Sequence, residues 1–192
     1  SAKSEVAAPA LTPASVPASS TPVPAGNTPA AVPGVATAAG TNTARELIDV
    51  QTDVLKLRFD SEGGTLLRAE LLKHTDAHRA DQPVVLLDES RERVYLAQSG
   101  LIPTAGAAAL PTHKTPMTLT SKERQLAEGA QELRLRFESA PVNGVKLVKT
   151  FVLRRGAYDM TVEHEVINQG AVTITPQLYV QLVRDGNKPE GE

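Results

Sequence analysis

The sequence predicts an all-β protein, with antiparallel strands that pack into two layers. Apolar and charged residues alternate at Leu55–Asp60 and again at Glu132–Glu138, and a period of two residues is typical of a strand with one buried face. Asn143-Gly144 follows the second of these stretches, and both residues tolerate the positive φ of a type I′ hairpin turn. Because one sheet cannot bury its apolar face alone, we expect a sandwich.

Residues 1–44 are expected to form a disordered, Pro/Ala-rich linker. Seven of the 14 prolines of the chain lie between Pro9 and Pro33, and proline at this density removes backbone donors and favours extended conformations. The composition changes at Arg45, so we place the β domain at residues 45–192. The linker is interpreted either as a spacer that holds the domain away from a membrane or as a disordered tail without a function.

The first half of the domain is expected to contain several short strands. They are Glu46–Val50, Val54–Phe59, Thr65–Leu72 (whose leucine spacing also permits a short helix), the apolar run Pro83–Leu87, and Val94–Gly100. Gly63-Gly64 predicts a bend, because glycine adopts backbone angles that are closed to other residues. The polar segment Lys73–Gln82 predicts a loop, and residues 103–116 predict a connection.

The second half predicts a four-stranded antiparallel meander. Its expected strands are Glu132–Glu138, Val145–Arg154, Tyr158–Val166 and Val172–Val183, joined by turns at Asn143-Gly144, Arg155-Gly156 and Asn168-Gln169-Gly170. We expect the strands before residue 100 to supply part of the second layer. We also expect further strands to follow Glu192, so that the chain ends inside its own domain.

Composition argues against several classes of function. A net charge of −2 does not favour nucleic acid as a partner. Aromatic residues make up 3% of the chain and Trp is absent, so surfaces on which bases or sugars stack are scarce. The lack of Cys excludes disulfides and thiolate ligands. No stretch of the sequence approaches the roughly 18–20 apolar residues of a membrane span.

Histidines provide the first candidate site residues. His74 and His78 are four residues apart, a spacing that brings two imidazoles to one face of a helix. No carboxylate completes this pattern and the segment predicts a loop, so we expect solvated surface histidines. His164 has the strand parity of Met160 and Val162, and we expect a partly buried neutral imidazole with one hydrogen bond rather than a catalytic base.

Charged residues provide the other candidates. Glu163 and Glu165 flank His164 on the opposite strand face, where two carboxylates could form an acid/base pair. A solvated face of alternating charge is the simpler interpretation. A group of basic residues is interpreted as surface charge that aids solubility and protects a strand edge. These are Lys146, Lys149, Arg154 and Arg155. The sequence therefore predicts no catalytic, cofactor-binding or metal-binding residue, and no phosphate loop or nucleophile elbow occurs.

Several runs of residues stand in an order and spacing that indicate a known family. They are Thr52–Leu55 leading into Gly63-Gly64, then Leu86-Leu87, Tyr95–Leu101 and Lys149–Tyr158. From residue 46 to about residue 184, the chain resembles the large periplasmic domain of the YidC family, the membrane protein insertases of Gram-negative bacteria. The Ala97–Leu101 and Lys149–Gly156 runs are specific when they occur together.

The resemblance implies a twisted β-supersandwich, similar to the fold of mutarotase-like carbohydrate-active proteins, and a place on the periplasmic side of the bacterial inner membrane. It also implies that the intact protein aids the insertion, folding and assembly of inner-membrane proteins, alone or with the Sec translocon and SecDF. The family's insertion site lies in a transmembrane bundle, so no functional residue is carried over and neither enzyme activity nor a cofactor is expected. The alternative is a carbohydrate-binding or sugar-epimerising β-sandwich, with His164 or Glu165 as its acid/base candidates.

Overall fold

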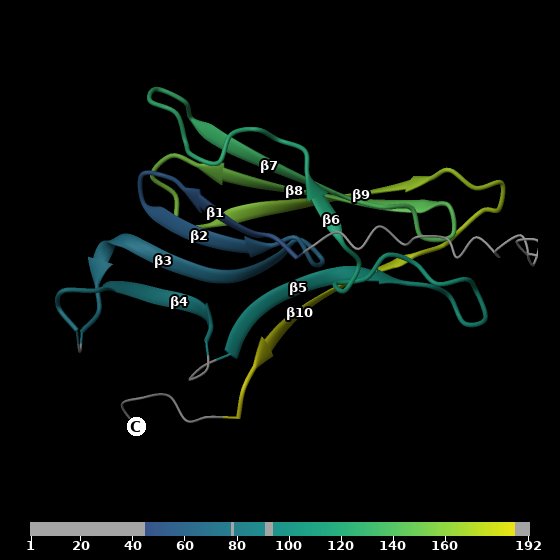
Figure 1. Ribbon diagram of the computed structural model, residues 1–192, viewed down its shortest axis with the longest axis horizontal. Coiled ribbons are helices and arrows are strands. Elements are labelled where there is room, and N and C mark those ends of the chain that lie inside the picture. The colour runs from purple at the N-terminus through teal and green to yellow at the C-terminus, as the bar shows by residue number, and fades with distance from the viewer. Residues whose placement is uncertain (1–44, 78, 91–93, 187–192) are drawn as a thin grey trace, which may run out of the picture. The chain divides into compact units, whose positions relative to one another are not determined.

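The computed structural model describes residues 45–77, 79–90 and 94–186. Within these ranges, all assigned secondary-structure elements are β-strands, and they form two antiparallel sheets (Figure 1). The predicted all-β antiparallel sandwich is thus confirmed. The expected linker at residues 1–44 lies outside the described residues. The domain boundary at Arg45 and the continuation beyond Glu192 stay predictions.

The larger sheet has the strand order β1-β2-β3-β4-β5-β10. Its strands are β1 (Leu47–Gln51), β2 (Leu55–Asp60), β3 (Thr65–Thr75), β4 (Pro83–Glu89), β5 (Val94–Ile102) and β10 (Gln177–Arg184). The segment for which a helix was also possible is therefore strand. β3 extends to Thr75, opposite Pro83, so the predicted loop at Lys73–Gln82 begins too early. β4 is half-buried, where its apolar run had predicted a buried strand.

The smaller sheet has the order β6-β7-β8-β9. Its strands are β6 (Met117–Leu119), β7 (Glu132–Ser139), β8 (Val145–Arg154) and β9 (Met160–Asn168). Asn143 and Gly144 have φ values of 49° and 79° between β7 and β8, which confirms the predicted hairpin. β6 has no counterpart among the predicted strands, because its three residues are too few to show a period.

The predicted four-stranded meander is wrong at its last strand. β10 does not follow β9 in the same sheet but pairs with β5, from Gln177 opposite Ile102 to Arg184 opposite Tyr95. Residues 169–176 cross between the sheets, and this connection is longer than the about two to five residues of most hairpin loops. Pro176 precedes β10 and cannot donate to a ladder, so the strand begins later than predicted.

The hydrophobic core lies between the two sheets. All three phenylalanines of the chain meet there: the ring centroid of Phe59 on β2 is 4.7 Å from that of Phe151 and 5.7 Å from that of Phe137. Inward-facing residues of both sheets surround these rings and are buried, among them Ile48, Val50, Leu55, Leu57, Leu133, Leu135, Leu147 and Leu153. The alternation seen in the sequence therefore separates the buried face from the exposed face.

The predicted bend at Gly63-Gly64 joins β2 to β3. Both glycines have positive φ, at 71° and 55°, and the backbone amide of Gly63 donates to the Thr115 carbonyl at 2.9 Å. A Cβ atom on Gly63 would lie 2.0 Å from the carbonyl oxygen of His113. Glycine is required here both by the backbone conformation and by the close approach of a second backbone segment.

We predict that Gly63→Ala lowers the free energy of unfolding by about 2–4 kcal/mol, because strain at positive φ adds to a backbone clash. Gly106→Ala is the matched control, since Gly106 has a φ of 80° but nothing lies within 4 Å of its added Cβ. That variant should lose only about 1 kcal/mol. Urea unfolding followed by circular dichroism measures both losses, and equal losses would contradict the role given to the close approach.

Candidate functional site

A buried lysine links the two sheets. Lys149 lies on β8 between the inward-facing residues Leu147 and Phe151, and it is only 1% exposed. Its ammonium nitrogen Nζ donates to the carbonyl oxygens of Gly63 and Ser99, at 2.6 Å each. Gly63 belongs to the β2–β3 bend and Ser99 to β5, so both acceptors belong to the larger sheet. One side chain of the smaller sheet therefore bonds to two separate segments of the other.

No carboxylate among the described residues forms an ion pair with Lys149, whose hydrogen bonds go to two backbone carbonyls. Burial lowers the pKa of its ammonium group from 10.5 to about 8, because the charged form loses its hydration. The group is still mostly protonated at neutral pH. A fully buried lysine without a carboxylate is uncommon, and hydrogen bonds from a charged donor are stronger than those between neutral groups.

His164 on β9 lies directly opposite Lys149 in the β8–β9 register. Its Nε2 atom is 2.8 Å from the Ser99 hydroxyl. Burial, and to a smaller extent the charge of Lys149, lower the pKa of this imidazole, so it is neutral at pH 7. The expected partly buried, hydrogen-bonded imidazole is confirmed.

His113 and Tyr179 form a second contact at this end of β5. The Tyr179 hydroxyl on β10 lies 3.0 Å from the backbone nitrogen of His113 and 2.5 Å from its Nδ1. The tyrosine crosses Gly100, where a Cβ would lie 2.5 Å from its hydroxyl. Burial lowers the pKa of His113, and the charges of Lys114 and Lys149 lower it further. Sequence reasoning missed both residues, because contacts between distant segments leave no periodic signal.

We call these five residues the lysine cluster. They are Ser99, His113, Lys149, His164 and Tyr179. The contact between Ser99 and His164 brings together the residue types of a nucleophile and a base. However, Ser99 is only 8% exposed. The hydrogen bond of the His164 ring goes to Ser99, and among the described residues no carboxylate orients this imidazole. The geometry therefore supports a role in cohesion between the sheets.

Glu163 and Glu165 lie on the opposite face of β9 and form ion pairs across β8. Glu163 is 2.6 Å from the Arg134 guanidinium, and Glu165 is 3.4 Å from that of Arg136. Val148, Thr150 and Val152 are buried on this outer face of β8, between the two flanking strands. The charged-face interpretation is confirmed. Each of the two carboxylates considered as an acid/base pair is thus held by an arginine of β7.

The predicted basic cluster does not exist. Lys146 bonds to Glu138 at 2.9 Å, Arg155 donates to the carbonyls of Ala127 and Ala130, and Lys149 points into the core. Alternate residues of a strand face opposite sides, so neighbours in sequence were separated in space. The same rule could have identified Lys149, which shares its parity with Leu147 and Phe151.

His74 and His78 do not assemble a metal site in the part of the chain that is described. His74 lies on β3, where its ring packs edge-on against Tyr158 with centroids 5.1 Å apart, and His78 is outside the described residues. Among the described residues, no three side chains of His, Asp or Glu come together as metal ligands.

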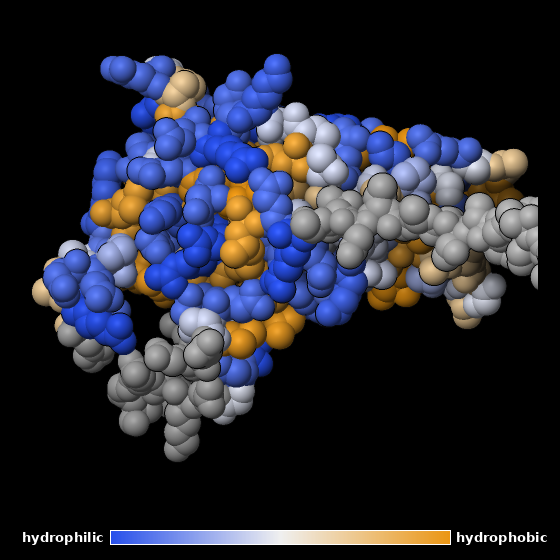
Figure 2. All heavy atoms as spheres, in the orientation of Figure 1, coloured by the Kyte–Doolittle hydropathy of each residue, from blue (hydrophilic) through white to orange (hydrophobic). Residues whose placement is uncertain are grey.

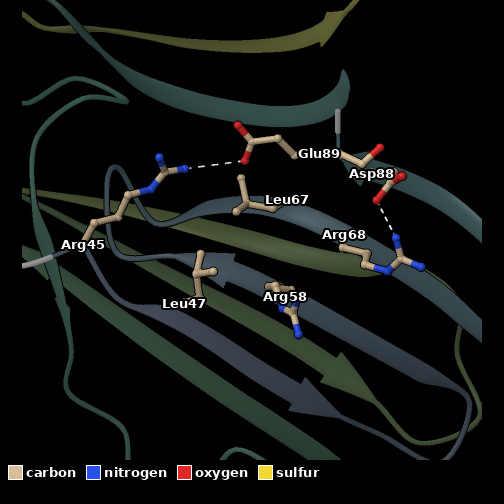
Figure 3. A pocket seen from close by; sticks show the side chains of 8 residues that line it. Arg45, Leu47, Arg58, Leu67, Arg68, Asp88 and Glu89 are labelled. Atoms are coloured by element: carbon tan, nitrogen blue, oxygen red, sulfur yellow. Dashed lines mark hydrogen bonds and ion pairs between the residues drawn. The ribbon is translucent and has the colours of Figure 1, made fainter. Parts of the chain in front are cut away.

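A groove of about 570 Å³ lies on the larger sheet (Figure 3). It is lined by Arg45, Leu47, Arg58, Leu67, Arg68, Asp88, Glu89 and Ser90. Its arginines are already paired: Arg45 with Glu89 at 3.5 Å, Arg68 with Asp88 at 2.5 Å, and Arg58 with Asp49 at 2.7 Å. Figure 3 shows Leu47 and Leu67 between the first two pairs. The groove is an ion-paired surface, separate from the lysine cluster.

An apolar stripe lies on β10. Leu178, Val180 and Leu182 are 49%, 68% and 64% exposed, and they lie opposite Leu101, Ser99 and Ala97 of β5. Residues directly opposite each other in a ladder share a face, so the stripe continues the inner face of the sheet. In the view of Figure 2, hydrophobic residues gather where β5 and β10 lie. β9 is the last strand of the facing sheet, and it leaves this stripe uncovered.

These features define an all-β sandwich domain whose internal polar groups connect its two sheets. No helix in the described part of the chain has the length and apolar character needed to cross a membrane.

Comparison with known proteins gives the family. The sequence profile of the YidC periplasmic domain matches residues 47–192, and the chain therefore belongs to this family. A protein named membrane protein insertase YidC from Bordetella avium is 45% identical over 160 residues, which cover 83% of this chain and 27% of the relative. The protein of the same name from Bordetella parapertussis is 43% identical over 146 residues, covering 76% and 25%. That from Nitrosospira multiformis is 37% identical over 154 residues, covering 80% and 26%. The chain thus spans about a quarter of the length of these relatives.

We predict that the stability of the chain rises with pH because of Lys149. Its pKa is about 8 in the folded state and near 10.5 in the unfolded state, so the unfolded chain binds more protons between these values. The burial penalty is fully present below pH 8 and is relieved as the pH rises toward 10.5, by roughly 3 kcal/mol in total. Urea midpoints measured across this range for the wild type and for Lys149→Met test the effect.

The rise should be missing from Lys149→Met and retained in Lys122→Met, a control at an exposed position. Other groups that titrate in this range contribute equally to all three proteins, so the difference between variants isolates Lys149. If Lys149→Met followed the pH profile of the wild type, the ammonium would not be desolvated in the folded state.

Proposed function

We propose that the chain is a non-catalytic periplasmic domain of a membrane protein insertase, and that it aids the insertion, folding and assembly of inner-membrane proteins. The observation that supports this most strongly is the family match over residues 47–192, together with relatives that are named membrane protein insertases. The domain would act as an interaction or scaffolding module. The insertion step itself would belong to the transmembrane part of the intact protein.

The arrangement of polar side chains supports a non-catalytic role. The Ser99 hydroxyl that contacts His164 is buried, and Glu163 and Glu165 are held in ion pairs with β7. A carbohydrate-epimerising sandwich would need an acid/base pair that lines a cleft. His164 and Glu165 face opposite sides of β9, and neither lines the described groove.

In this proposal the domain faces the periplasm at the bacterial inner membrane, and residues 1–44 serve as its spacer. Its partners would be the Sec translocon and SecDF, while nascent inner-membrane proteins would be engaged through the transmembrane part of the intact protein. The net charge of −2 does not favour nucleic acid.

We predict that removal of this domain slows insertion without abolishing it. In the intact protein, a flexible linker would replace residues 45–192, and a second variant would lack only residues 10–40. Pulse labelling with protease accessibility measures insertion of inner-membrane proteins, and co-purification measures the association with SecDF. We expect the first variant to insert several times more slowly and to recover less SecDF, whereas the second should keep its association with SecDF.

Two outcomes would contradict the proposal once the amounts of protein in the membrane are matched. Complete loss of insertion would show that the domain takes part in the insertion step itself. Unchanged insertion together with unchanged recovery of SecDF would show that the domain aids neither process.

A further inference from the structure

The lysine cluster contains three groups that can carry positive charge, and one of them, Lys149, is fully buried. Lys149 already carries a charge at neutral pH. His164 lies opposite it on β9. His113, on the connection between β5 and β6, lies near enough for the charge of Lys149 to lower its pKa. Protonation of either imidazole would place a second cation beside a buried ammonium, which costs free energy because charge repulsion is weakly screened in the interior.

Few negative charges face this cluster. β5 contributes the Ser99 hydroxyl and carbonyl, and the β2–β3 bend contributes the Gly63 carbonyl. The Tyr179 hydroxyl of β10 contacts His113 on the other face of β5. Among the described residues, Glu62 is a carboxylate that acts on the cluster, and its charge favours protonation of His113. Lys114 lies 4.0 Å from the Glu62 carboxylate and offsets part of this charge. The glutamates that neighbour His164 on β9 point to the outer face, toward Arg134 and Arg136.

The two histidine contacts fasten the least covered strands of the sandwich. β9 and β10 are the last strands of their sheets, and most of their residues are exposed or half-exposed. The Ser99–His164 contact holds β9 to β5 across the interior, and the His113–Tyr179 contact holds β10 to the connection after β5. Strands with few buried contacts open locally at a lower free energy than the core.

We propose that the lysine cluster is an acid-sensitive latch: protonation of His164 and His113 beside the Lys149 ammonium opens β9 and β10 while the rest of the sandwich stays folded. The latch goes beyond the proposed function, since it concerns a conformational change within the domain and requires no partner. It would let a mildly acidic medium release both edge strands from the sandwich.

The direction of the pH response follows from the pKa values of the two imidazoles. The pKa of each is lowered in the closed state and returns toward about 6.5 when the strand opens. The open state therefore binds more protons below this value, and the closed state is favoured above it. Each histidine can increase the open population by up to about tenfold when the pH falls from about 7.5 to about 5.5. Because Glu62 opposes the effect at His113, His164 should contribute more.

Hydrogen exchange followed by mass spectrometry tests the latch on the 192-residue chain. After correction for intrinsic exchange rates, peptides from β9 and β10 should lose up to about tenfold of their protection at the lower pH, whereas peptides from β1, β2 and β7 keep theirs. In His164→Gln the glutamine can retain a hydrogen bond to Ser99 but cannot be protonated. In this variant, the acid-induced loss of protection in β9 should therefore be abolished. His74→Gln, at an exposed histidine on β3, should respond like the wild type.

The proposal would be overturned if the wild type and His164→Gln lost the same protection in β9, or if all strands lost protection together. Lys149→Met supplies an independent test, because it removes the charge that both histidines meet. Its β9 and β10 should respond less to acid than those of the wild type, and a full response would contradict the latch. If His164→Gln fails to fold, the comparison between Lys149→Met and the wild type decides the matter.

Discussion

A charged amine that is buried between two β-sheets must find its hydrogen-bond acceptors there, because an unpaired buried charge costs several kcal/mol. Lys149 finds them in the carbonyls of Gly63 and Ser99, so the β2–β3 bend and β5 must both lie within reach of one nitrogen on β8. The bend is fixed in turn by two positive φ values and by the approach of His113 to Gly63. The three phenylalanines pack beside this point and supply the apolar contact between the sheets.

The cohesion between the sheets is uneven. Around Lys149 and the phenylalanines both sheets are covered, whereas β9 and β10 are covered on fewer sides and keep apolar residues in contact with solvent. The same side of the sandwich carries the two histidine contacts. A domain built in this way has a stable centre and a side whose strands can open at low cost. This is compatible with the interaction role proposed for the domain.

Periodicity predicted most of the strands, because Leu133, Leu135 and Phe137 alternate with charged residues and each such strand has one buried face. It did not predict the sheet to which β10 belongs, since pairing depends on where residues 169–176 lead the chain. The YidC resemblance was found from short runs of residues, and the family match confirms it. The charge of Lys149 predicts a surface position, whereas its parity with Leu147 and Phe151 predicts a buried one, and the structure follows the parity. The contact between His113 and Tyr179 joins residues far apart in sequence, and no local pattern records it.

The buried ammonium is tested most directly by NMR, with the ¹³Cε resonance of Lys149 followed through a pH titration of the folded chain and assigned with Lys149→Met. If its two acceptors are the carbonyls of Gly63 and Ser99 in a dry interior, the resonance should titrate with a pKa of about 8. A titration close to the ordinary value of 10.5 would show that the side chain is hydrated. The link between the two sheets would then have to rest on the phenylalanines alone.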